Sequence, residues 1–355
     1  MKIRYLPLFF LCFSLFAGIL PLQGEKYDYL VDFERQKVVC GIEEFSFDSQ
    51  IKAGYFFVYE KNLYCLNKGE LRNLNRKNRL IARFDKAILP CSDFLSFSIQ
   101  DLILDNLLFI PVQDGFFVFD MEERNVKGRL KCVFDRSETD IVLPDILVQR
   151  DYFFLVFNKR VEIYGNFERK NTFYFKNSIF FDISVGDNFF TILSVEKPGG
   201  LFSIKTVLKA YDFDFKLLNT KELEVFPKNI FRAGGDFVFE TKEISVFSLF
   251  GSKKIHFVKT DLKHGKIKEY SFSVSHKRRH VFPFYYGKKI FLVVQCKDGK
   301  VYFLDLNRDK KKRLDKKVYY DYTFLKGKKG GVFYEKSSDN YFPVRFELSF
   351  LSRIF

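Results

Sequence analysis

The sequence predicts an all-β protein, a β-propeller of about seven four-stranded blades whose ring is closed by the amino-terminal segment. Helical periodicity is nearly absent, and apolar or aromatic runs of four to seven residues alternate with short polar turns. Two segments show the pattern best: LLFIPVQDGFFVFD at residues 107–120 and IFLVVQCKDGKVYFLD at residues 290–305. Each contains two apolar runs joined through Asp-Gly, a strong hairpin signal because the turn requires a positive φ at the glycine.

The spacing of the weaker copies extends this pattern over most of the chain. Hairpins of this kind begin near residues 55, 107, 152, 188, 236, 290 and 331, a spacing of roughly 35 to 55 residues that is typical of propeller blades. One four-stranded unit cannot bury both of its faces alone, so neighbouring units must pack against one another. Continuous apolar runs such as FFLVF at residues 153–157 fit strands that are buried on both faces.

Two finer expectations follow from the repeat. Residues 27–42 resemble the outer part of a blade, so we expect them to complete the last blade and close the ring. Asp120 and Asp305 recur at the same point of the repeat. Recurrence favours a structural role, in which each carboxylate accepts backbone N–H groups of the turn that follows.

The amino terminus has the pattern of a secretory signal. Lys2 and Arg4 precede an apolar run over residues 6–22, and Gly24 precedes two charged residues. Cys12 has no small residue before it, which argues against a lipoprotein. An uncleaved anchor is the alternative.

The signal pattern predicts how the chain is divided and where the protein is located. Residues 1–24 form the signal peptide, and residues 25–355 form a single propeller domain with no transmembrane span in the mature chain. We therefore expect a periplasmic or extracellular protein.

The charge of the chain limits the class of partner. The formal net charge is +15, and loss of Lys2 and Arg4 with the signal lowers it by 2 to +13. Nucleic acid is an improbable partner for an exported protein, which leaves an acidic protein or an anionic surface of the cell envelope. Two basic segments form the candidate interaction surface, with solvated turns as the alternative; the residues are His276, Lys277, Arg278, Arg279, Lys310, Lys311, Lys312 and Arg313.

The sequence gives no catalytic, cofactor-binding or metal-binding residues. All four histidines lie within residues 256–280, and His276 and His280 are four residues apart. In an extended strand that separation is roughly 13 Å, too far for one ion. No nucleophile elbow, zinc-protease motif or phosphate loop is present. We therefore expect a non-enzymatic protein without a cofactor.

One family resemblance accompanies this interpretation. The stretch VVQCKDGKVYFLDLNRDKK at residues 293–311 resembles the repeat of pyrroloquinoline-quinone-type propellers: strand, Asp-Gly, strand, then Leu-Asp and a basic turn. The stretch IPVQDGFFVFDME at residues 110–122 is a second, less complete copy. That family includes quinoprotein dehydrogenases and the propeller subunit of the outer-membrane barrel-assembly machinery. The chain departs from the dehydrogenases because it is short and has neither tryptophan nor an adjacent cysteine pair.

The resemblance implies a scaffold similar to the assembly subunit rather than a dehydrogenase. The predicted function is thus an exported, non-enzymatic propeller scaffold that binds a protein or a cell-envelope partner. The alternative is a propeller enzyme that acts on a glycan or a small molecule at the central channel.

Overall fold

The structure is a computed structural model, and it describes most of the chain from residue 19 onward. The described residues are 19–22, 27–40, 43–48, 54–84, 97–98, 102–136, 141–197, 204–242, 254–286, 289–314, 317–327, 330–335 and 340–345. Within these ranges the regular structure is strand, with one short 3₁₀ helix, η3 (Leu262–His264). No helix of the described part is long and apolar enough to cross a membrane.

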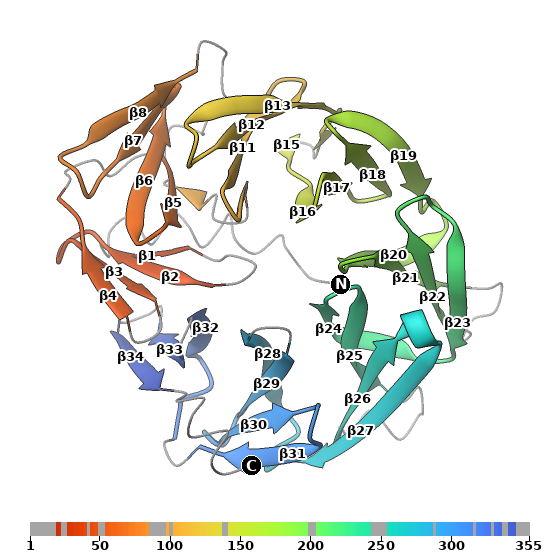
Figure 1. Cartoon of the computed structure of the whole chain (residues 1–355). Helices are drawn as coiled ribbons and strands as arrows, with labels where there is room; N and C mark the ends of the chain where they lie inside the picture. Colours follow the sequence, from red (N-terminus) through yellow and green to blue (C-terminus); the bar gives the residue numbers. More distant parts are fainter. Residues whose placement is uncertain are drawn as a thin grey trace. The chain divides into compact units, whose positions relative to one another are not determined.

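The fold class is the β-propeller, as predicted. The strands of its sheets are labelled in Figure 1. Seven sheets each contain four strands that follow one another in the chain and pair antiparallel. A further sheet of three described strands follows at the carboxyl end. The contacts divide the described chain into two compact units: residues 147–162 with 171–321, and the residues up to 146 with 163–170 and those from 322 onward.

The first three sheets belong to the second of these units. The first sheet contains β1 (Ile19–Leu22), β2 (Tyr29–Asp32), β3 (Lys37–Cys40) and β4 (Glu43–Ser46). The next contains β5 (Tyr55–Tyr59), β6 (Asn62–Asn67), β7 (Glu70–Asn73) and β8 (Arg79–Arg83), with the short β9 (Phe97–Ser98) parallel to β5. The third contains β10 (Ile103–Leu104), β11 (Leu107–Val112), β12 (Gly115–Asp120) and β13 (Asn125–Lys131).

A short ladder and four further sheets follow in the middle of the chain. The ladder pairs β14 (Asp135–Arg136) with β15 (Ile141–Val142). The next sheet contains β16 (Asp145–Gln149), β17 (Tyr152–Val156), β18 (Arg160–Gly165) and β19 (Glu168–Tyr174). The sheet after it contains β20 (Ser178–Val185), β21 (Phe189–Glu196), β22 (Lys205–Asp212) and β23 (Leu217–Leu223).

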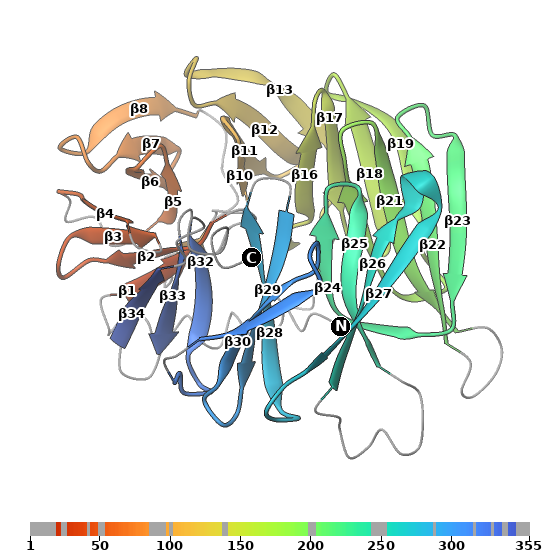
Figure 2. The same ribbon diagram turned by 60° about the horizontal axis from the view of Figure 1, so that its bottom comes forward.

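The remaining strands complete the series (Figure 2). One sheet contains β24 (Phe226–Ala233), β25 (Asp236–Lys242), β26 (Lys254–Asp261) and β27 (Lys266–Ser273). The next contains β28 (Arg279–Tyr286), β29 (Lys289–Cys296), β30 (Val301–Asp305) and β31 (Lys310–Arg313). The three-stranded sheet contains β32 (Thr323–Gly327), β33 (Gly330–Glu335) and β34 (Asn340–Arg345).

The core follows from the continuous apolar runs in the sequence. In β21 the first seven of eight residues are buried, and all five residues of β30 are buried. A strand with a single covered face would alternate between buried and exposed side chains. Continuous burial therefore shows that both faces of these strands are covered, as the sequence predicts.

The recurring aspartates are structural, as predicted. Asp120 Oδ1 accepts hydrogen bonds from the backbone N–H groups of Glu122 and Glu123, both at 2.9 Å. Asp305 Oδ1 accepts the equivalent bonds from Asn307 at 2.9 Å and Arg308 at 3.3 Å. Each carboxylate thus fixes the turn between the third and fourth strands of its sheet.

The amino-terminal segment forms a sheet of its own, which corrects one expectation. We expected residues 27–42 to complete the last blade, but within the described residues 27–40 the strands β2 and β3 pair with each other and lie between β1 and β4. Asp32 Oδ1 accepts the N–H groups of Glu34 and Arg35 at 3.1 and 2.9 Å and so closes a local hairpin. β1 also lies within residues 1–24, the segment expected to be a signal peptide.

This first sheet nevertheless contacts the carboxy-terminal sheet, as closure by the amino-terminal segment requires. The backbone N–H of Asp28 donates to the carbonyl of Lys326 at 2.7 Å, and the N–H of Lys326 donates to Asp28 Oδ2 at 2.8 Å. One buried cluster joins the two sheets; its members are Ile19, Leu30, Val39, Leu325, Val332 and Tyr334.

Candidate functional site

The predicted basic residues lie on two neighbouring parts of one sheet. His276, Lys277 and Arg278 form the turn that leads into β28, and Lys310–Arg313 is β31 itself. Arg279 pairs with Cys296 at the end of β29, and Arg313 pairs with Tyr302 at the start of β30. The turn before β28 and the last residue of β31 therefore lie at the same end of the sheet.

Arg279 does not belong to this surface, which corrects the prediction. Its Nη2 atom lies 2.8 Å from Glu240 Oε1, and the two side chains are only 10% and 6% exposed. Asn229 donates to the other oxygen of Glu240 at 2.7 Å. The sequence could not distinguish this buried guanidinium from its exposed neighbour Arg278, because Glu240 belongs to another sheet.

Lys311 links the two basic segments. Its Nζ donates to the backbone carbonyl of Ser273 at 2.5 Å, and it lies 5.4 Å from the centre of the Tyr302 ring. Ser273 precedes the His276 turn by three residues, so Lys311 reaches the segment that leads into that turn. Lys310 lies at the opposite end of β31, where it pairs with Asp305.

Two cations outside the eight predicted residues lie at the same end of the sheet. The N–H of Lys297 donates to the carbonyl of Arg278 at 3.0 Å. Lys317 lies beside Gly299, whose carbonyl accepts a bond from Val318 at 2.8 Å. Lys297 lies beside Arg278 because β29 pairs with β28. We call the exposed cations at this end the basic end: Lys277, Arg278, Lys297, Arg313 and Lys317.

One acidic residue lies next to these cations. Burial acts to raise the pKa of Asp298, but hydrogen bonds from Ser275 and Lys300 hold that pKa below its ordinary value. Lys300 Nζ lies 3.3 Å from Asp298 Oδ2. Because Lys300 offsets the charge of Asp298, the basic end keeps its positive character.

The histidines of this region have separate structural roles. His276 Nδ1 accepts the N–H of Arg278 at 3.0 Å and so shapes the turn. The ring of His280 stacks on Tyr320 with centres 4.2 Å apart. Burial, followed by the charge of Lys228, lowers the pKa of His280. Within the described ranges, no three His, Cys, Asp or Glu side chains lie close enough to hold a metal ion.

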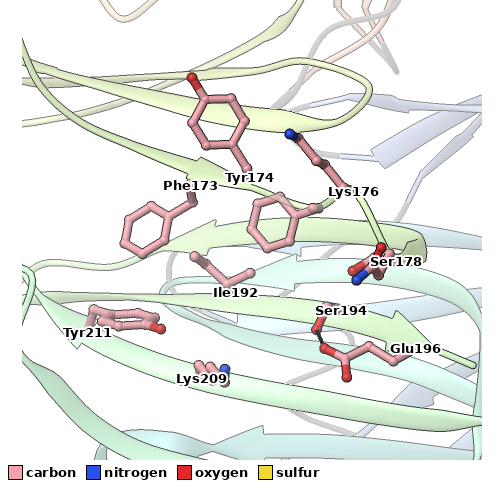
Figure 3. Close-up of a pocket in the computed structure, with 11 residues that line it drawn as sticks. Phe173, Tyr174, Lys176, Ser178, Ile192, Ser194, Glu196, Lys209 and Tyr211 are labelled. Atoms are coloured by element: carbon pink, nitrogen blue, oxygen red, sulfur yellow. Dashed lines mark hydrogen bonds between the residues drawn. The ribbon is translucent and has the colours of Figure 1, made fainter. Parts of the chain in front are cut away.

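A groove that the sequence did not indicate lies in the same unit (Figure 3). Its volume is about 630 Å³. The floor is one face of the sheet β20–β23, and one wall is the connection from β19 to β20. The lining residues are Phe173, Tyr174, Phe175, Lys176, Asn177, Ser178, Ile192, Ser194, Glu196, Lys209 and Tyr211.

The two ends of the groove differ in chemistry. Figure 3 shows Phe173 and Tyr211 at one end and Ser178 and Glu196 at the other. The rings of Phe173 and Tyr211 are 5.2 Å apart, and Tyr211 stacks on the buried Phe190 at 5.5 Å. Burial raises the pKa of the Tyr211 hydroxyl. At the polar end, the Ser194 hydroxyl donates to Glu196 Oε1 at 3.3 Å.

Comparison with solved structures gives several matches at low identity. BamB from Moraxella catarrhalis matches with a TM-score of 0.47 and 12% identity, over 91% of this chain and 92% of that chain. BBS1N in complex with ARL6DN matches with a TM-score of 0.39 and 12% identity, over 80% and 88% of the two chains.

A structure of the eukaryotic initiation factor matches with a TM-score of 0.42 and 11% identity, over 90% and 88% of the two chains. No family model and no curated protein matches the sequence.

Proposed function

We propose that the chain is an exported, non-enzymatic β-propeller scaffold that binds an anionic partner of the cell envelope through its basic end. The observation that carries the proposal is the convergence of Arg278, Lys297 and Arg313 at one end of a single sheet. Arg278 precedes β28, Lys297 follows β29 and Arg313 ends β31, so strand pairing places together cations from three separate segments of the chain.

The magnitude of the expected attraction depends on how many charges act together. One exposed cation near an anionic membrane contributes about 1 kcal/mol at low salt. A single surface charge would therefore have a small effect, whereas several neighbouring charges multiply the binding constant. The attraction should weaken as salt rises, since the screening length is about 10 Å at 0.1 M ionic strength.

Changing Lys277, Arg278, Lys297 and Arg313 together to Ser should weaken binding to anionic vesicles by roughly two orders of magnitude or more at low salt. The wild-type protein should bind vesicles that contain a fifth or more of anionic lipid, bind neutral vesicles poorly, and release as salt rises. Co-sedimentation with vesicles at two salt concentrations measures all three effects.

A second variant with the same loss of charge controls for nonspecific attraction. It changes Arg76, Arg79, Lys131 and Lys266 to Ser, four exposed cations that belong to other sheets or to the turns of those sheets. This control should bind nearly as well as the wild type. Equal binding by both variants, or binding that is indifferent to salt, would exclude the basic end as the contact surface.

Export has its own test in the mass of the native protein. The signal pattern of residues 1–24 predicts a mature chain that begins near Glu25 and carries no acyl group. The first sheet would then retain β2, β3 and β4, with β2 at its edge. Intact mass spectrometry of protein purified from its source decides between this outcome and a chain that retains β1, in which Leu22 is fully buried.

A further inference from the structure

We propose that the groove between the β19–β20 connection and the sheet β20–β23 binds an extended acidic peptide segment, with aromatic or aliphatic side chains, from another protein. The proposal does not depend on the basic end, which lies on the sheet β28–β31. It rests on the shape, ring contacts and charges of the groove.

The floor of the groove fits an extended chain. Ile192, Ser194 and Glu196 alternate along β21 and therefore point to one face, and Lys209 and Tyr211 extend that face onto β22. The four-residue separation of Ile192 and Glu196 corresponds to roughly 13 Å of strand. A peptide of about four to five extended residues would run along this length.

The aromatic end favours a large apolar side chain. Phe173, Phe190 and Tyr211 form a cluster of rings with centres 5.2 to 6.1 Å apart. The neighbouring Tyr174 is 66% exposed, so its ring is accessible to a ligand. Among the described residues the Tyr211 hydroxyl has no hydrogen-bond partner. A bound chain would cover these rings and offer a carbonyl to that hydroxyl.

The charges of the groove favour an acidic ligand. Lys176 lies on the wall and Lys209 on the floor, and neither forms an ion pair within the part of the chain that the structure describes. Glu196, the one carboxylate of the lining, accepts the hydroxyl of Ser194. Two lysines opposite each other attract a carboxylate placed between them. A neutral oligosaccharide would stack on the rings but leave both ammonium groups unused.

The probe for this proposal is a fluorescein-labelled peptide of sequence Gly-Ser-Glu-Glu-Phe-Phe-Gly-Ser, in which each face of the extended chain presents one carboxylate and one ring. We expect saturable binding to the full chain by fluorescence polarisation, and much weaker binding when lysine replaces both glutamates or serine replaces both phenylalanines. In the double variant Lys176→Glu/Lys209→Glu, the affinity for the acidic peptide should fall at least tenfold. The same variant should bind the lysine peptide more tightly than the wild type does.

A matched double variant keeps the test specific to the groove. Lys221 pairs with Leu208 and so belongs to the opposite face of the same sheet, and Lys263 is exposed in η3. Lys221→Glu/Lys263→Glu therefore carries the same charge change and should bind the acidic peptide as the wild type does. Absence of saturable binding, equal loss in both double variants, or tighter binding of maltoheptaose than of the peptide would overturn the proposal.

Discussion

Replacing Arg279 with Ala should lower the free energy of unfolding by about 3–5 kcal/mol, because the change leaves a buried charge without its main partner. The Glu240 side chain is buried, and it would keep only the hydrogen bond from Asn229. Urea denaturation followed by far-UV circular dichroism measures the change.

The neighbouring arginine provides the control for this prediction. Arg278 is exposed, so Arg278→Ala should change the free energy of unfolding by no more than about 0.5 kcal/mol. A variant that removes both charges, Arg279→Met with Glu240→Gln, should recover much of the stability, since an uncharged pair needs no compensation for lost hydration. If the Arg279→Ala variant were as stable as the Arg278→Ala variant, the ion pair of Arg279 with Glu240 would make no contribution to stability.

Replacing Gly115 with Ala should lower the free energy of unfolding by at least about 3 kcal/mol. The backbone conformation at this position and the space around the residue both require glycine. Gly115 has a φ of 136°, and a Cβ at this position would overlap the backbone carbonyl of Leu130 on the paired strand β13. Neither group can move without breaking the pairing of β12 with β13. The measurement is the midpoint and slope of a urea unfolding curve.

The corresponding glycine of the second Asp-Gly hairpin separates the two causes. Gly299 has a φ of 81°, but the nearest atom to an added Cβ lies 3.4 Å away. Gly299→Ala should therefore lower the free energy of unfolding only by the penalty for a positive φ at alanine, about 1–2 kcal/mol. If the two alanine variants were equally stable, the overlap with Leu130 would have no energetic importance.

Local patterns in the sequence were sufficient to predict the fold class. Each blade is a run of hairpins between strands adjacent in the chain, and the turn chemistry of Asp120, Asp305 and the Asp-Gly pairs is local. Apolar runs such as that of β21 indicate burial on both faces without knowledge of the neighbour. These features made the propeller class predictable.

The candidate sites depend on contacts that no local pattern encodes. The role of Arg279 follows from Glu240, 39 residues earlier in the chain. Lys297 joins the basic end because β29 pairs with β28, and the groove arises where the connection after β19 meets the face of β21 and β22. The register of each sheet and the partner of each face had to be known first.

The contact between the first and last sheets must form later in folding than the hairpins within each sheet. Asp28 and Lys326 are 298 residues apart, and closing a flexible loop of that length costs about 5 kcal/mol of chain entropy. The hairpins within each sheet close short loops and can form while the chain is still being synthesised. The contact of Leu30 and Val39 with β32 and β33 must await the synthesis of those two strands, so these apolar side chains are exposed to aggregation until then.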